Sequence, residues 1–149
     1  NSHGGCTRSA LAIFEILRVL SDEKGIKIVT QTLDECSSAA VVLFLAGDER
    51  YATAYSSFLI HEVSVEESKR KQADGYKATA DELEKEAYII FDLIKSRTKL
   101  TLAMIKKKVK NAKDNDWIFD VDEAMKVNIV THAGFYMPDA VVELDEEST

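Results

Sequence analysis

Short segments with the composition of β-strands alternate along this chain with segments whose apolar residues recur at helical spacing. Residues 26–32 are rich in β-branched side chains, whereas residues 9–20 repeat apolar side chains every three or four positions. Further short strands are predicted at 50–54 and 58–61. Strands that alternate with helices are typical of domains in which helices pack against a sheet. We therefore expect a layered α/β fold.

The remaining segments extend this pattern. Residues 37–46 are small and apolar throughout, which predicts a buried helix that Gly47 ends. The charged segment 64–96 contains no proline and predicts one long projecting helix, or two nearly continuous ones. Residues 98–111 predict a helix whose lysine-rich end is a solvated face. The other expected features are a charged turn at 22–25, strands at 117–119 and 128–131, a helix at 121–126 and a frayed acidic tail at 143–149.

Composition limits the classes of protein that the chain can belong to. Its 149 residues suffice for one domain with its own core. A net charge of −7 argues against nucleic acid or an anionic membrane as the main partner. No apolar run reaches the roughly 18 residues that a membrane span needs. Cys6 and Cys36 lack metal-ligand spacing, so we expect no metal, and we also expect no cofactor. With only two cysteines, we expect a reducing, cytoplasmic setting.

Three short motifs carry the parts that serine hydrolysis needs. The chain opens with NSHGG, residues 36–40 read CSSAA, and residues 58–61 read FLIH. A serine becomes a nucleophile when an adjacent base takes its proton, and the developing oxyanion needs preorganised N–H donors. Ser38 begins the predicted buried helix, Gly4–Gly5 permits a close backbone approach, and His61 ends a short strand. The joint pattern favours a serine peptidase.

Each motif alone also has a structural interpretation. The CSSAA segment is typical of a helix N-cap followed by tightly packed small residues. A single histidine such as His61 is more often a hydrogen-bonded structural residue than a general base, and a Gly-Gly turn by itself indicates little. Only the order and spacing of the three motifs favour catalysis.

The same order resembles the proteolytic subunit of the Clp protease family, in the crotonase-like superfamily. In that family the first turn reads close to INSPGG, the nucleophile precedes a helix that ends in Ala-Gly, and the histidine follows Met-Ile. Residues 1–5, 38–47 and 59–61 are similar to these three landmarks, and residues 116–130 are similar to the family's C-terminal aromatic strand, Glu-Ala pair and last strand. The resemblance implies a single domain over 1–149, built from repeated β-β-α units with a projecting handle at about 64–97.

The resemblance also implies roles for individual residues. Ser38 matches the nucleophile because it keeps the family's spacing to the Ala-Gly at the helix end, and Ser37 is the neighbouring alternative. His61 matches the general base. The backbone N–H groups of Gly5 and Ala39 match the donors of the oxyanion hole.

The third member of the catalytic triad stays open. The family places an aspartate between the handle helix and the aromatic strand. Counted backward from the Glu-Ala pair this position is Ala112, and counted forward from the handle it is Lys108, so neither count finds an acid. Asn111 is a possible neutral partner, and Asp114 or Asp116 serves if the loop folds back. Because the acid orients the histidine and stabilises imidazolium, its loss would slow the enzyme.

Two further positions depart from the family. His3 replaces the proline of the first turn and adds a titratable group near the expected site, although an exposed loop residue is its simpler interpretation. Asn128 replaces a glycine before the last strand, which is tolerable because asparagine accepts left-handed backbone conformations.

The function that the resemblance implies is a serine endopeptidase that cleaves unfolded polypeptide through an acyl-enzyme. It further implies homo-oligomeric stacked rings that a partner AAA+ unfoldase supplies with substrate. This chain has no phosphate-binding GxxxxGK[ST] motif, so any dependence on ATP would belong to that partner. Virus-encoded relatives act alone on capsid-assembly proteins, so a phage origin also fits. The alternatives are a non-catalytic ring subunit and, disfavoured by the Ser–His spacing, an acyl-CoA enzyme of the crotonase group. Because no strand precedes the first turn, we expect a further segment upstream of Asn1.

Overall fold

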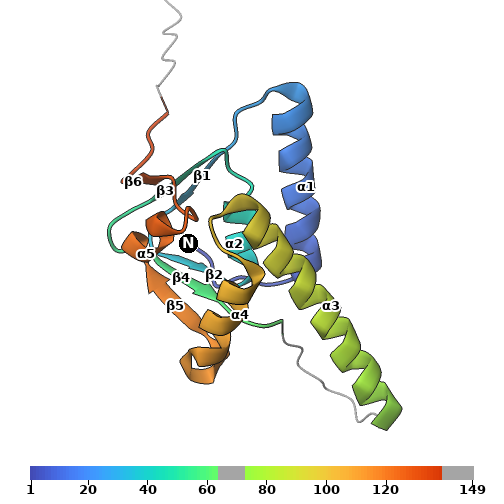
Figure 1. Ribbon diagram of the computed structural model, residues 1–149. Helices are drawn as coiled ribbons and strands as arrows, with labels where there is room; N and C mark the ends of the chain where they lie inside the picture. The colour runs from blue at the N-terminus through green and yellow to red at the C-terminus, as the bar shows by residue number, and fades with distance from the viewer. Residues whose placement is uncertain (64–72, 139–149) are drawn as a thin grey trace, which may run out of the picture.

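Strands and helices alternate in the computed structural model of the chain, which describes residues 1–63 and 73–138 (Figure 1). The elements are α1 (Thr7–Lys24), β1 (Val29–Thr32), β2 (Glu35–Ser37), α2 (Ala39–Phe44), β3 (Glu49–Ala52), β4 (Ser57–Ile60), α3 (Ala73–Arg97), α4 (Leu102–Asn111), the 3-10 turn η1 (Lys113–Asn115), β5 (Trp117–Asp120), α5 (Val121–Lys126) and β6 (His132–Ala133). Two successive β-β-α units, β1-β2-α2 and β3-β4-α3, confirm the expected mixed α/β fold.

Two small sheets position the rest of the molecule. In one sheet the order is β1-β3-β6 with all strands parallel. In the other the order is β2-β4-β5, where β4 pairs with β2 in parallel and with β5 antiparallel. Because β2 and β4 are parallel neighbours, the residues that follow them meet at one edge of this sheet.

The core forms where α2 packs against both sheets and α1. Small side chains on α2, such as Ala39 and Ala40, are buried together with Val41 and Val42. Phe58 of β4 is fully buried, and its ring stacks on that of Phe119 with centroids 5.5 Å apart. Burying a side chain of this size stabilises a fold by about 1.5–3 kcal/mol. The predicted buried helix at 37–46 is therefore confirmed, although it is shorter.

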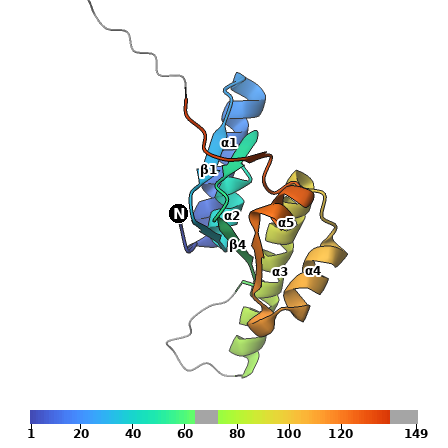
Figure 2. The same ribbon diagram turned by 90° about the vertical axis from the view of Figure 1, so that its left-hand side faces the viewer.

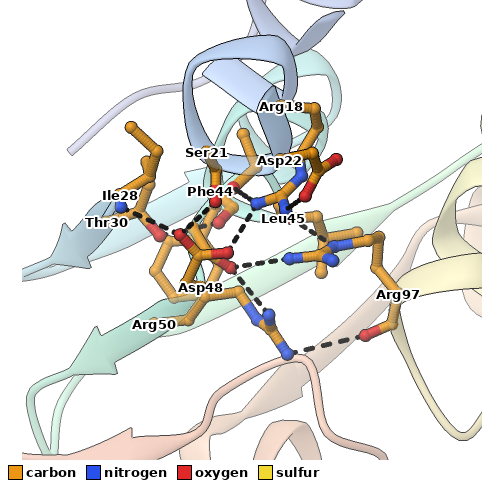
Figure 3. A network of polar contacts seen from close by, with 12 residues as sticks. Arg18, Ser21, Asp22, Ile28, Thr30, Phe44, Leu45, Asp48, Arg50 and Arg97 are labelled. Atoms are coloured by element: carbon orange, nitrogen blue, oxygen red, sulfur yellow. Dashed lines mark hydrogen bonds and ion pairs between the residues drawn. The ribbon is translucent and has the colours of Figure 1, made fainter. Parts of the chain in front are cut away.

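A polar network joins α1 to the loop after α2 (Figure 3). The Asp48 carboxylate accepts hydrogen bonds from the Ser21 hydroxyl at 2.8 Å and the Ile28 N–H at 2.9 Å. It also pairs with Arg18, whose guanidinium is 2.7 Å away. The partly buried carboxylate thus has three donors, which offset the cost of removing it from water.

Two further arginines bind backbone carbonyls beside this network (Figure 3). The buried Arg50 donates to the carbonyls of Gly47 and Asn128, both at 2.8 Å, and to Ile129 at 2.7 Å. Arg97, the last residue of α3, donates to the carbonyl of Gly47 at 3.0 Å. Burial, and next the charge of Arg97, lowers the pKa of Arg50 to about 10. These bonds attach the end of α3 to the end of α2.

The structure corrects two of the sequence predictions. The expected charged turn at 22–25 is wrong because α1 continues to Lys24 and ends at Gly25, whose φ is 66°. The expected strand at 128–131 is wrong because Asn128 adopts a φ of 61° and its N–H bonds back to Met125, which turns the chain. The last strand is β6 instead. Asn128 does adopt the left-handed conformation expected of it.

The remaining predictions differ only at their ends. The strands expected at 26–32, 50–54, 58–61 and 117–119 correspond to β1, β3, β4 and β5, and the helix at 121–126 is confirmed as α5. The three-residue strand β2 was not predicted. The N-terminal half of α3 projects from the body (Figure 2), in line with the expected handle, but residues 64–72 of that segment and the acidic tail at 143–149 lie outside the described residues.

Candidate active site

Ser38 and His61 are in direct contact. A hydrogen bond of 2.7 Å joins Ser38 Oγ and His61 Nε2. Ser38 directly follows β2, and His61 directly follows β4. The register Ser37↔Leu59 of these parallel strands brings the two residues to the same sheet edge. The strand order of the sheet therefore produces the serine–histidine pair from residues 23 positions apart in the sequence.

Ser38 has an unusual backbone conformation, with φ 56° and ψ −124°. Residues other than glycine rarely adopt such a backbone conformation, because it costs about 1–3 kcal/mol and persists only where the surrounding structure maintains it. Here the Ser38 N–H donates to the Leu59 carbonyl at 2.8 Å, and the Ser38 carbonyl accepts from Val41 at 3.0 Å. A strained turn between a strand and a helix is the geometry that exposes the nucleophile in α/β-hydrolases.

A cavity of about 140 Å³ lies beside this pair. Its lining includes the polar residues Thr7, Ser38 and His61, together with Gly5 and Ala39. The rest of the lining is apolar and includes residues from α2, β4 and α3. The apolar lining residues are Val42, Ile60, Val63, Ile90 and Ile94. The cavity therefore combines reactive polar groups with an apolar wall.

The backbone N–H groups of Gly5 and Ala39 border the cavity. Within the described part of the chain, neither group donates a hydrogen bond to another residue. The turn reaches this position because Gly4, with φ 100°, lies against Ser37 and Ser38: a Cβ atom there would be 2.7 Å from the Ser37 carbonyl and 2.8 Å from Ser38 Cβ. Glycine is thus required at Gly4 by both space and backbone conformation.

Of the three open candidates for the triad, Asp116 lies beside His61. Its Oδ1 is 3.7 Å from His61 Nδ1, which is an ion-pair distance and longer than a hydrogen bond. In the antiparallel pair of β4 and β5, Ile60 lies opposite Trp117. His61 follows Ile60 and Asp116 precedes Trp117, so His61 and Asp116 also lie opposite each other. Among the described residues, Asn111 and Asp114 make no hydrogen bond or ion pair with His61.

The loop reaches this arrangement through η1, where Asp114 and Asn115 both have positive φ, 58° and 61°. This turn reverses the chain between α4 and β5, as the expected fold-back requires. Lys108, the position found by counting forward, instead pairs with Glu123, and its ammonium lies 4.7 Å from the centroid of the Trp117 ring. Neither sequence count reaches Asp116, the acid that lies beside His61.

The neighbouring residues Ser37 and Cys36 are directed elsewhere. The Ser37 hydroxyl is buried and donates to Glu35 Oε1 at 2.6 Å rather than contacting His61. Burial raises the pKa of the Cys36 thiol to about 12, so this thiol stays protonated. His3 is exposed, and its Nδ1 is 2.6 Å from Glu35 Oε2. Sequence reasoning missed Glu35, for which the only signal was an acid directly before the CSSAA motif.

Within residues 1–63 and 73–138, no group of three or more His, Cys, Asp or Glu side chains is arranged to hold a metal ion. No described helix combines the length and the apolar character needed to cross a bilayer.

The fold and this cavity define an α/β protein with a serine–histidine pair at a sheet edge. The sequence profile of the family described as Clp protease matches residues 1–134, and the chain belongs to this family. Among solved structures, a point mutant of ClpP1 from Listeria monocytogenes is similar, with a TM-score of 0.68 and 21% identity over 89% of this chain and 69% of that chain. At this identity the similarity shows the ClpP fold. No curated protein matches the chain.

Proposed function

We propose that the protein is a serine endopeptidase of the Clp type. The observation that carries this proposal is the 2.7 Å contact between Ser38 Oγ and His61 Nε2 beside the cavity. The hydroxyl of a serine is a weak nucleophile until a base accepts its proton, and an imidazole nitrogen at this distance is such a base. Membership of the Clp protease family supports the same reaction class.

In the proposed reaction, Ser38 Oγ attacks the carbonyl carbon of a peptide bond while its proton passes to His61 Nε2. The N–H groups of Gly5 and Ala39, which have no acceptor among the described residues, bind the resulting oxyanion. Collapse of this intermediate expels the amine, which takes the proton from His61, and leaves an ester on Ser38. A water molecule, deprotonated by His61, then hydrolyses this ester and regenerates the free hydroxyl.

Asp116 is the proposed third member of the triad. Its carboxylate faces His61 Nδ1 at 3.7 Å, so it stabilises the imidazolium by charge. A shift of about 1 Å would convert this ion pair into a hydrogen bond that also fixes the tautomer of His61.

The apolar wall of the cavity favours unfolded polypeptide as the substrate. Ile90 and Ile94 of α3 line the same cavity as Ser38 and His61, where they can contact an apolar side chain next to the scissile bond. Such side chains are accessible in unfolded chains and in loosely folded assembly proteins, the two substrate classes that the family resemblance implies. Cleavage beside apolar residues is the expected specificity.

The proposed working form is a homo-oligomer of stacked rings that receives substrate from an AAA+ unfoldase. Support comes from the projecting helix α3, which has the place of the family's handle, and from the family itself (Figure 1). The proposed location is the cytoplasm, where free thiols such as those of Cys6 and Cys36 stay reduced.

Reaction with a fluorophosphonate tests the proposal, because this probe labels only an activated serine. We expect an adduct on Ser38 in the assembled protein and cleavage of casein. Both signals should fall to background in Ser38→Ala and His61→Ala. Ser96→Ala is the matched control, since its hydroxyl bonds the Leu93 carbonyl on α3, and it should behave as the unaltered protein. Undiminished cleavage by Ser38→Ala would disprove the site.

A non-catalytic ring subunit is the second candidate function. The 3.7 Å separation of His61 and Asp116 favours it, because a triad without a hydrogen bond at this point has weak support for its imidazolium. The two functions differ in one result. A protein that assembles but forms no adduct on Ser38 is a structural subunit.

A further inference from the structure

Glu35 connects the turn that carries Gly5 to the strand that carries the nucleophile. Its Oε2 is 2.6 Å from His3 Nδ1, and its Oε1 accepts a hydrogen bond of 2.6 Å from the Ser37 hydroxyl. His3 lies two residues before Gly5, and Ser37 directly precedes Ser38. We call His3, Glu35 and Ser37 the Glu35 bridge.

The turn needs such a connection because, beyond Ser2, its backbone forms no hydrogen bond to β2 among the described residues. Ser2 pairs with β2, since its N–H donates to the Glu35 carbonyl at 2.8 Å and its carbonyl accepts from Ser37 at 3.0 Å. Beyond Ser2, Gly4 and Gly5 have φ of 100° and 145°, and glycine has more backbone freedom than any other residue. Gly4 packs closely against Ser37, but among the described residues the His3 side chain makes the one polar contact from residues 3–6 to β2.

The other half of the bridge fixes the carboxylate itself. Ser37 is only 5% exposed, so the surrounding atoms fix the direction of its hydroxyl. The hydrogen bond from Ser37, and next the one from His3, lowers the pKa of Glu35. Glu35 is therefore an ionised acceptor at neutral pH, and it presents one oxygen to each partner.

We infer that His3 and Glu35 are positioning residues that hold the Gly4–Gly5 turn so that the Gly5 N–H faces the cavity. This inference rests on the proposed function. Neither side chain lines the cavity, so they act through Gly5 and not on the substrate. Because Gly5 is proposed to bind the oxyanion, which forms only after attack, loss of the bridge should lower kcat more than it raises KM.

The experiment compares the rate of Ser38 acylation by a fluorophosphonate, together with kcat and KM for a peptide, in the assembled protein. The variants are Glu35→Gln, His3→Ala and His3→Gln, the last of which keeps a hydrogen-bond donor at this position. The matched control is Glu49→Gln. Glu49 likewise has one oxygen 2.6 Å from a cation, Lys27, and another 3.1 Å from the hydroxyl of Tyr51 two residues on, but it lies in the other sheet.

We expect Glu35→Gln and His3→Ala to slow acylation about tenfold, a fraction of what loss of a whole oxyanion donor costs, with KM nearly constant. Glu49→Gln should stay within about twofold of the unaltered protein. His3→Gln should keep intermediate activity, because its amide still donates a hydrogen bond to the Glu35 carboxylate.

Two results would overturn the inference: Glu35 and His3 variants as active as Glu49→Gln, or a loss in these variants that appears as a raised KM with kcat unchanged. Failure of the proposed function is distinct, because the unaltered protein would then form no adduct on Ser38 at all. His3 is 90% exposed, so its variants fold even if Glu35→Gln does not.

Discussion

Ser38, the proposed nucleophile, has a backbone conformation that residues other than glycine rarely adopt. Its φ of 56° and ψ of −124° are maintained by the pairing of β2 and β4, and they direct the hydroxyl toward His61. Strain of this kind is retained where function requires it and otherwise lowers stability. The backbone conformation of Ser38 therefore lowers the stability of the fold while it directs the hydroxyl toward His61.

This strain predicts that Ser38→Gly is more stable than Ser38→Ala by about 1 kcal/mol, because glycine accepts positive φ without cost. Both variants lack the hydroxyl, so the comparison isolates the backbone. The same pair of changes at Ser96, inside α3, should have the opposite sign, since glycine destabilises a helix by about 1 kcal/mol relative to alanine. Urea denaturation measures both differences. Equal signs at the two positions would show that Ser38 is not strained.

Asp116 is the second residue whose role can be measured. We expect Asp116→Asn to lower kcat about 10- to 100-fold, less than the roughly 10⁴-fold loss seen when a hydrogen-bonded triad aspartate is changed, because its carboxylate is 3.7 Å from His61 and partly exposed. Asp114→Asn and Asn111→Ala should change kcat less than twofold. Steady-state kinetics on one peptide compares all three. A larger loss in either of the other two variants would move the third triad role to that residue.

At the scale of elements, Asp48 links α1 to the loop between α2 and β3. Burial by itself would raise the pKa of Asp48, but hydrogen bonds from Ile28, Arg18 and Ser21 outweigh it and lower the pKa to about 2. A carboxyl group whose pKa is lower in the folded than in the unfolded chain stabilises the fold above the unfolded pKa, about 3.9. This stabilisation is lost as pH falls from about 4 to about 2.

We therefore expect Asp48→Asn to lower the free energy of unfolding by about 1–2 kcal/mol at pH ~6, and by much less at pH ~2. Asp22→Asn is the control, because Asp22 pairs with the same Arg18 but is mostly exposed. Urea denaturation at both pH values gives the four differences needed. A loss for Asp48→Asn that is independent of pH would mean that its charge contributes nothing.

The sequence predicted elements better than it predicted their pairing. Periodicity identified α1, α3 and α5, because each element carries its own apolar pattern. Strand β2 was missed because three residues are too short for a pattern. The position of Asp116 opposite His61 depends on the register of β4 with β5, and the left-handed turn at η1 sets where β5 begins. Such long-range pairing has no local signal, so the third triad partner stayed open.

The pairing of Ser38 with His61 was predictable for a different reason. Both residues belong to motifs whose order and spacing resemble the Clp protease family. The Glu35 bridge had no such motif, since His3 departs from the family at that position. Contacts specific to this chain, unlike those shared with the family, became visible only in the structure.

At the scale of the whole molecule, α3 has two distinct faces. Ile90 and Ile94 are buried and line the cavity, and Arg97 fixes the end of the helix to the carbonyl groups after α2. The adjacent face exposes Ile89, which is 51% accessible, and Tyr88. Single exposed apolar residues are common, but a pair on a projecting helix fits a surface that another subunit covers.

We expect Ile89→Asp to reduce the mass of the proposed stacked assembly, because a charge placed in an apolar contact between subunits must be desolvated without a partner. Sedimentation measures the mass, and thermal unfolding checks that the protomer itself is intact. Met125→Asp is the matched control, because it introduces the same charge at an exposed apolar residue of α5, away from the handle. If the two variants sediment alike, the exposed face of α3 does not hold subunits together, and the proposed handle contact is wrong. If only Ile89→Asp dissociates, comparing its rate of Ser38 acylation with that of the intact assembly shows whether acylation depends on assembly.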